Sequence, residues 1–131
     1  MMKIKCRPIS QGIIMGEAMI SDDPISFYGD VDPETGIIIN PKHQLYKKSI
    51  QDKILIFPIG RGSTVGSYII YRSALRGVGP KGMICKQAEH IVAVGAIMSD
   101  IPMVDKPEKF DFKNGQKIKL DADKGLSLIH I

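Results

Sequence analysis

The sequence predicts a single α/β domain over residues 1–131, in which short β-strands at both ends of the chain surround two central helices. Three observations lead to this prediction. The chain has 131 residues, which is close to the usual size of one domain. Apolar runs of strand length, interrupted by Gly, Pro and Asp, dominate both ends of the chain. Two central segments, 65–77 and 89–99, instead carry helical signals.

Short strands are expected first, at residues 13–15, 25–28 and 37–39. Residues 53–59 form a continuous, largely β-branched run, which is typical of a central strand covered on both faces. This strand ends at the glycine-rich segment 60–64. A helix is expected to follow over residues 65–77, because apolar residues recur there at helical spacing and Gly77 is a favoured residue just after a helix.

The second half of the chain continues the alternation of strands and helices. Residues 82–87 predict a strand. Residues 89–99 contain several small side chains and fit either a tightly packed helix or a strand, and we favour the helix. Residues 101–105 return to extended structure, and 118–121 with 126–129 flank turn-forming residues as a β-hairpin.

Composition excludes several classes of protein. Apolar residues make up 44% and charged residues 24%, which is ordinary for a folded soluble domain and excludes disordered and fibrous proteins. The longest apolar run, residues 91–98, is much shorter than the roughly 20 residues that a membrane-spanning helix needs. The first residues alternate charged and apolar side chains, unlike a signal peptide. A cytoplasmic location is therefore expected, with no membrane partner.

Cysteine and histidine spacing argues against a metal site built by this chain. Cys6 and Cys85 lie far apart and are expected to be reduced and buried. An iron–sulfur cluster normally needs three or four thiolates, and structural zinc needs closely spaced Cys or His pairs. His43, His90 and His130 lie in separate segments, so each is expected to be a structural residue rather than a ligand or a base.

The net charge of +4 is unevenly distributed. Between residues 54 and 104 the basic residues outnumber the acidic ones; they are Arg61, Arg72, Arg76, Lys81 and Lys86 against Glu89 and Asp100. A basic zone can bind nucleic acid, but the chain has no Trp, few other aromatic residues and no nucleic-acid motif. A small anionic substrate fits this zone better.

The glycine-rich turn at residues 59–68, between a buried strand and a helix, is the strongest local signal for chemistry. Glycines allow the backbone to approach a ligand, and the first N–H groups of a helix attract anions. Arg61 adds a guanidinium, and Ser63 lies where positive potential would help its hydroxyl oxygen to accept a proton. The structural alternative is that Ser63 or Thr64 only caps the helix.

Other functions of this turn are less well supported. Its spacing differs from that of a nucleotide-binding P-loop, and it lacks the Gly-x-Ser-x-Gly pattern of a serine hydrolase. A phosphate-carrier domain would need a histidine in the turn, and residues 60–68 contain none. A non-catalytic regulator that binds an anion would share the turn but would not need the hydroxyl of Ser63.

Residues 60–68, followed by 95–97 and 101–105, resemble the small subunit of aconitase X enzymes. The resemblance covers nearly the whole chain, from the region of Gly12 to the C-terminal hairpin. It implies a swivelling β/β/α domain, like the mobile domain of aconitases. It also implies a large partner subunit that carries a 4Fe–4S cluster, so that this chain works in a heterodimer or a larger assembly and binds no cluster alone.

The resemblance further implies a hydro-lyase in which Ser63 removes a proton α to a carboxylate while the partner's cluster assists loss of a hydroxyl. In this family, a small subunit that forms a separate chain implies dehydration of (R)-5-phosphomevalonate to trans-anhydromevalonate 5-phosphate. Relatives in which both subunits are fused into one chain imply dehydration of a hydroxyproline such as cis-3-hydroxyproline. Arg61, with Gly62 and Thr64, is then expected to contact one anionic end of the substrate. This end is either the carboxylate or the phosphate.

The sequence predicts a position, but no chemical role, for three residues outside the turn. Arg72 and Arg76 lie later on the predicted helix and are expected to face the partner subunit or solvent. Asp105 is expected in a turn or an interface.

Overall fold

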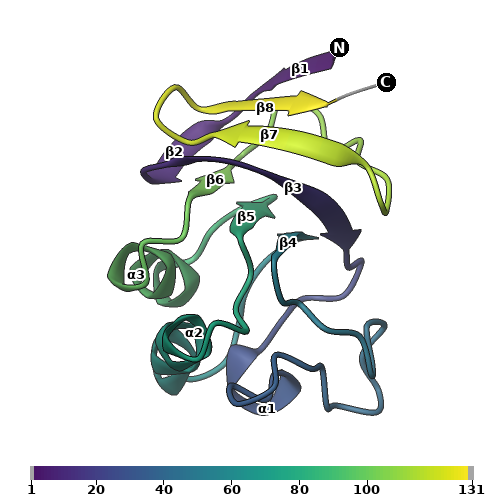
Figure 1. Ribbon diagram of the computed structural model, residues 1–131, viewed down its shortest axis with the longest axis vertical. Helices are drawn as coiled ribbons and strands as arrows, with labels where there is room; N and C mark the ends of the chain where they lie inside the picture. Colours follow the sequence, from purple (N-terminus) through teal and green to yellow (C-terminus); the bar gives the residue numbers. More distant parts are fainter. Residues whose placement is uncertain (1, 130–131) are drawn as a thin grey trace.

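The computed structural model describes residues 2–129 (Figure 1). The strands in this range are β1 (Met2–Lys5), β2 (Arg7–Ser10), β3 (Ile13–Ile20), β4 (Lys53–Phe57), β5 (Gly82–Cys85), β6 (Met103–Asp105), β7 (Lys117–Asp121) and β8 (Leu126–Ile129). The helices are α1 (Phe27–Asp30), α2 (Val65–Leu75) and α3 (His90–Met98). Within residues 2–129, none of these helices has the length and hydropathy needed to cross a membrane.

The strands form one mixed sheet in the order β1-β8-β7-β3-β4-β5-β6-β2. Its centre, β3 to β6, is parallel, and the outer strands pair antiparallel. Parallel neighbours require a crossover, which α2 provides between β4 and β5 and α3 provides between β5 and β6. The carboxyl ends of β4, β5 and β6 therefore meet at one edge of the sheet.

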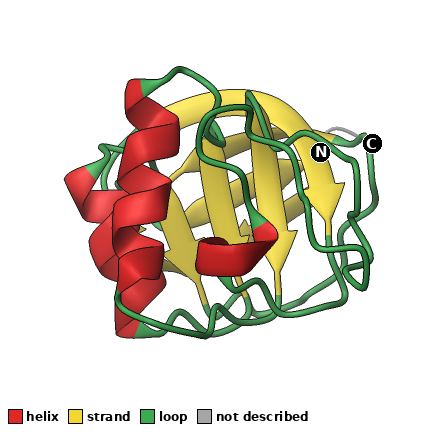
Figure 2. Ribbon diagram, turned by 90° about the horizontal axis from the view of Figure 1, so that it is seen from below, coloured by secondary structure: helices red, strands yellow, loops and turns green. Residues whose placement is uncertain are grey.

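The molecule has two β layers and one helical layer. In Figure 1, β1, β8 and β7 lie above the parallel strands, and Figure 2 shows the helices together on one face of the sheet. Alternate residues of β4 serve two apolar cores: Ile54 and Ile56 face the other β layer, and Leu55 and Phe57 face the helices. All four are fully buried, which confirms the predicted central strand covered on both faces.

Both predicted helices are confirmed. α2 ends at Leu75, and Gly77 follows with a φ of +73°, a left-handed conformation that suits glycine after a helix. The N-terminus of α3 is capped by Glu89, whose carboxylate accepts the N–H groups of Ile91 (2.8 Å) and Val92 (2.9 Å). This cap satisfies two of the N–H groups that the first turn of a helix leaves without partners, and so favours the helix over the alternative strand.

Most of the predicted strands are also confirmed. The strands predicted at 13–15, 82–87 and 101–105 correspond to β3, β5 and β6, and the predicted hairpin is formed by β7 and β8. β1 and β2 were outside the predicted set. Their short segments mix charged and apolar residues, and they become strands by pairing with β8 and β6.

Two predicted short strands are wrong. In segment 25–28, Ile25 forms only an isolated bridge and the chain then turns through α1. The turn is closed because Asp30 donates its N–H to the carbonyl of Ser26 (3.0 Å) and accepts the N–H of Ser26 on its carboxylate (2.9 Å). Segment 37–39 likewise contributes isolated bridges rather than a strand. Ile25, Phe27 and Ile38 are buried in the core on the helical face of the sheet, whereas Tyr28, Ile37 and Ile39 are exposed.

Candidate functional site

The glycine-rich segment 60–64 lies at the edge of the sheet where the parallel strands end. β4 leads toward it and α2 begins directly after it. Its start is tied to Ile25, which donates its N–H to the carbonyl of Ile59 (3.1 Å) and accepts the N–H of Arg61 on its own carbonyl (3.0 Å). This short parallel pairing fixes the direction in which the segment leaves the sheet.

Two glycines of the segment fit against the chain itself. A side chain at Gly60 would collide with Val92 and would approach the carboxylate of Glu89, both at the start of α3. Gly62 has a φ of +105°, and a side chain there would collide with the hydroxyl of Ser26. The close approaches that the sequence predicted for these glycines are thus made to neighbouring segments of the protein.

Ser63 caps α2. Its Oγ accepts the N–H of Val65 (3.1 Å), and its carbonyl accepts the N–H of Gly66 (2.9 Å). Thr64 makes no capping bond with its side chain. The predicted structural role therefore falls to Ser63, but it does not use up the hydroxyl, because an oxygen that accepts one hydrogen bond keeps a second lone pair. The side chain is exposed.

The surroundings of the Ser63 hydroxyl favour negative charge on its oxygen. A hydrogen bond donated by Val65 stabilises the deprotonated form more than the neutral form. The N-terminus of α2 adds the positive end of a helix dipole, and no acidic residue lies in its first turn. The N–H groups of Gly62 and Thr64 donate to no backbone carbonyl within residues 2–129, so they remain available to an anion.

Arg61 lines a cavity of about 490 Å³ beside this segment. The other walls come from residues 23–30, which include α1, and from residues 40–43 in the loop after it. Within residues 2–129, Arg7, Arg72 and Arg76 each pair with a carboxylate, whereas Arg61 is in none of the ion pairs. Its guanidinium is therefore available to bind an external anion.

Lys42 lines the same cavity and was missed by the sequence reasoning. It lies in a loop between α1 and β4, well separated in sequence from Arg61. Only the tertiary fold brings the two cations to one cavity, so no local motif could have indicated the pair.

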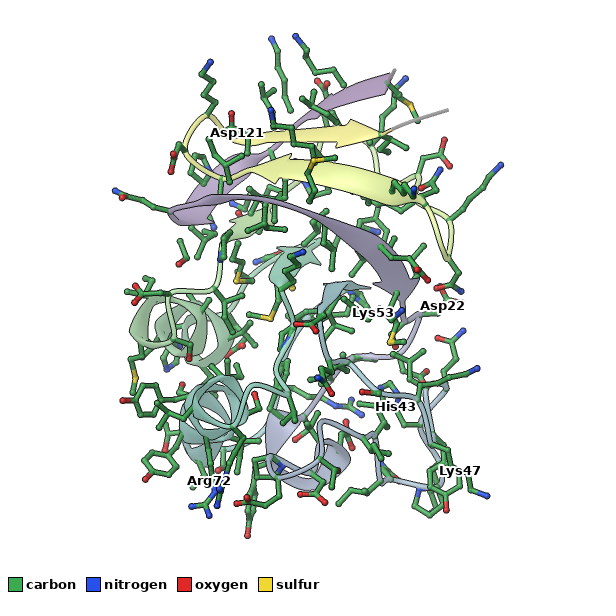
Figure 3. All side chains as sticks on the ribbon, viewed as in Figure 1. Asp22, His43, Lys47, Lys53, Arg72 and Asp121 are labelled. Carbon is green, nitrogen blue, oxygen red and sulfur yellow. The ribbon has the colours of Figure 1, made fainter. Side chains whose placement is uncertain are left out.

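His43 also lines the cavity, but its ring is fully engaged by the backbone. Leu45 donates its N–H to Nδ1 (3.0 Å), so Nε2 carries the hydrogen and donates it to the carbonyl of Pro24 (3.1 Å). Figure 3 shows His43 among the loops that precede β4. The structural role predicted for His43 is confirmed. His90 is the exposed first residue of α3, and His130 lies outside the described residues.

The basic zone predicted from the sequence does not form one surface. Arg72 and Arg76 are half-exposed, and both bind the carboxylate of Glu34, the second at 2.7 Å. Both side chains are nevertheless exposed, as the prediction that they face solvent or a partner requires, and both pair within this chain. Lys81 lines a different cavity near the amino ends of the parallel strands. Of this zone, only Arg61 lines the cavity beside the glycine-rich segment.

Asp105 is fully buried at the end of β6, so its predicted position in a turn or an interface is wrong. Its carboxylate accepts Nε (2.8 Å) and Nη2 (2.7 Å) of Arg7 and the N–H of Ala88 (2.9 Å). These bonds join β2, β6 and the connection that leads into α3. Asp105 therefore stabilises, from within the protein, the edge of the sheet at which the glycine-rich segment lies.

Both cysteines are free, as expected, but only Cys85 is buried while Cys6 is half-buried. Burial raises the pKa of the Cys85 thiol to about 12, and burial also raises the pKa of Cys6. Within residues 2–129, no three His, Cys, Asp or Glu side chains lie together in an arrangement that could hold a metal ion. The described part of this chain does not fit an iron–sulfur cluster.

The Cys85 thiol predicts a pH dependence of stability. Its pKa is raised from 9.0 to about 12 in the folded protein, so the unfolded chain loses this proton first as the pH rises. The free energy of unfolding should fall between about pH 9 and pH 12, by up to about 1.4 kcal/mol per pH unit from this group. Urea unfolding should show a shallower decline for Cys85→Ala than for the wild type. Parallel declines would contradict the assignment.

Comparison with known proteins gives matches that span nearly the whole chain. The family of aconitase X swivel domains matches residues 3–129. A phosphomevalonate dehydratase small subunit from Methanococcoides burtonii is 51% identical over 126 residues, 94% of this chain and 92% of that protein. Its counterpart from Thermococcus sibiricus is 49% identical over 124 residues, 95% of each chain. The crystal structure of Thermococcus kodakaraensis aconitase X in its holo-form superposes with a TM-score of 0.97 and 47% identity, covering 100% of both chains.

Proposed function

This chain belongs to the aconitase X swivel-domain family, and from that premise we propose that it is the small subunit of a phosphomevalonate dehydratase. The reaction is dehydration of (R)-5-phosphomevalonate to trans-anhydromevalonate 5-phosphate, in a modified mevalonate route to isoprenoids. The observation that carries this proposal is the position of Ser63. Its exposed hydroxyl lies at the positive end of α2, two residues after Arg61, whose guanidinium is in none of the ion pairs within residues 2–129.

Ser63 acts as the base. Its oxygen, in the deprotonated form, accepts the proton on C2 of the substrate, the carbon next to the carboxylate. The electrons of the broken C–H bond form the double bond between C2 and C3, and the hydroxyl group leaves C3 and becomes water on protonation. The Val65 N–H and the α2 dipole support this role because both stabilise negative charge on Oγ before the proton arrives.

Arg61, Gly62 and Thr64 bind the substrate. The guanidinium of Arg61 supplies positive charge in the cavity, and Gly62 and Thr64 supply backbone N–H groups at the start of α2. An α-proton becomes more acidic when the neighbouring carboxylate is hydrogen-bonded, because charge develops on its oxygens as the proton leaves. The available N–H groups beside Ser63 suit this purpose.

The proposal includes a large subunit that carries a 4Fe–4S cluster, in a heterodimer or a larger cytoplasmic assembly. When bound, such a cluster supplies a Lewis acid for the leaving hydroxyl. The relatives named as small subunits support the presence of a larger partner subunit. Residues 1–131 would act as one swivelling domain that presents Ser63 to the substrate on that partner, without nucleic acid or membrane involvement.

The test is anaerobic reconstitution of this chain with its cluster-loaded large subunit, followed by proton NMR of (R)-5-phosphomevalonate. Dehydration creates a vinyl proton on C2, so a new alkene signal should grow as the substrate signals decline. An assembled, cluster-loaded complex that leaves phosphomevalonate unchanged but dehydrates cis-3-hydroxyproline would replace the proposed substrate. A complex that turns over neither would favour a non-catalytic, anion-binding role.

A further inference from the structure

The cavity beside Arg61 brings together two positive side chains from separate loops. Arg61 enters it from the segment before α2, and Lys42 enters it from the loop between α1 and β4. Among residues 2–129 neither takes part in an ion pair, although the chain pairs its other three arginines. An anion that enters this cavity therefore meets two cations that form no direct salt bridge within residues 2–129.

Two carboxylates also line the cavity, but donors of the chain already bind them. The buried carboxylate of Asp30 accepts the N–H of Ser26 (2.9 Å) and the amide of Asn40 (2.9 Å). Asp23 accepts the N–H of Gln44 (2.8 Å). These bonds hold the loops that form the wall, and three of the four carboxylate oxygens accept a backbone or amide N–H. The carboxylates keep their charge but cannot donate a hydrogen bond, so the strongest donors that the cavity offers a guest are the cationic side chains of Arg61 and Lys42, which favour an anion.

We propose that Lys42 and Arg61 together bind the phosphate monoester of the substrate, while its carboxylate stays beside Ser63. This inference rests on the proposed function, which supplies a substrate with both anionic groups. The carboxylate is bonded to the carbon that loses its proton, so it must lie next to the base. Phosphorus is separated from that carbon by C3, C4, C5 and the ester oxygen, a distance similar to the two-residue span from Ser63 to Arg61, at most about 7 Å.

Charge supports the same assignment. A phosphate monoester carries close to two negative charges at neutral pH, and two cations from different walls of one cavity match it better than they match a single carboxylate. The N–H groups of Gly62 and Thr64 suffice for the monoanionic carboxylate. Lys42 would then be a specificity residue that distinguishes phosphorylated from unphosphorylated substrates.

The first test measures binding without turnover. The isotope-labelled full chain is titrated with inorganic phosphate and, separately, with acetate, and backbone amide shifts are followed by NMR. Phosphate should shift residues 40–43 and 60–62 more strongly than acetate does, and Lys42→Gln should weaken phosphate binding by about tenfold. The matched control is Lys47→Gln, an exposed lysine of the same loop that lies outside the cavity (Figure 3).

The second test uses the cluster-loaded complex. Lys42→Gln should raise KM for phosphomevalonate by about tenfold or more and leave kcat within a factor of about two, because it removes binding far from the reacting carbon. Lys47→Gln should change neither constant. Unchanged KM in Lys42→Gln, or acetate binding equal to phosphate binding in the cavity, would overturn the assignment.

The two tests separate this inference from the proposed function. If phosphate binds at Lys42 but the complex does not dehydrate phosphomevalonate, the phosphate site stands and the dehydratase proposal fails. If the complex dehydrates phosphomevalonate and Lys42→Gln behaves as the wild type in both tests, the dehydratase proposal stands and the phosphate site fails.

Discussion

Ser63→Ala should lower kcat of the cluster-loaded complex by about 10²- to 10⁴-fold, the usual contribution of a general base. The substitution removes the oxygen that accepts the C2 proton. It also removes the acceptor for the Val65 N–H. The free energy of unfolding should therefore fall by about 0.5–2 kcal/mol, as for the loss of other helix caps. The rate is measured by the growth of the vinyl proton signal, with assembly of the complex confirmed beforehand.

Two further variants separate the base from the cap. Ser63→Asn keeps a side-chain oxygen that can accept the Val65 N–H but has no hydroxyl, so it should restore stability and leave the enzyme inactive. Ser63→Thr keeps the hydroxyl and should retain measurable turnover. Turnover by Ser63→Asn close to that of the wild type would show that Ser63 acts only as the cap of α2.

The proposed site could be located from the sequence because its signals are local. A buried strand, the glycines and the capping residue all fall within residues 53–66, and each has a conformational preference that does not depend on distant parts of the chain. The position of Ser63 at the start of α2 therefore follows from the sequence. The geometry of its hydrogen bond to Val65 required the structure.

The rest of the site could not be predicted, since tertiary contacts create it. Lys42 reaches the cavity only because the loops around α1 fold back against the carboxyl edge of the sheet. Asp105 looked like a turn residue because an acidic side chain after a short strand is commonly exposed, and only the pairing of β2 with β6 supplies its partner Arg7. Such pairings are set by the sheet order, which a local pattern does not encode.

The wrong strands have a related cause. Residues 25–28 and 37–39 are rich in isoleucine and aromatic side chains, which is a β-strand signal only when a neighbouring strand is available for pairing. Here Ile25, Phe27 and Ile38 enter the core on the helical face, and turns within the loops take up most of the backbone hydrogen bonds. The apolar pattern thus identified burial for part of each segment, since Tyr28, Ile37 and Ile39 are exposed, and it identified the backbone conformation incorrectly.

Gly62→Ala should lower kcat/KM by at least about tenfold, even though position 62 carries no reacting group. Its φ of +105° disfavours any side chain, at a cost of about 1–2 kcal/mol, and a Cβ would collide with the hydroxyl of Ser26. The positive φ strains the segment, and the collision displaces either the Ser26 hydroxyl or the segment itself, so we expect the neighbouring Ser63 to shift relative to the substrate. A displacement of about 1 Å at a catalytic group is enough for a loss of this size.

Gly115→Ala is the matched control for this prediction. Gly115 also has a positive φ, +82°, but a Cβ there would meet no atom within 4 Å, and the residue lies before β7, outside segment 60–64. Both variants should therefore lose similar stability in urea unfolding, whereas only Gly62→Ala should lose activity in the assembled complex. Equal activity losses would mean that backbone strain in general, and not contact with Ser26, accounts for the effect. A Gly62→Ala complex as active as the wild type would show that the segment tolerates displacement, and would remove the structural reason for glycine beside the proposed base.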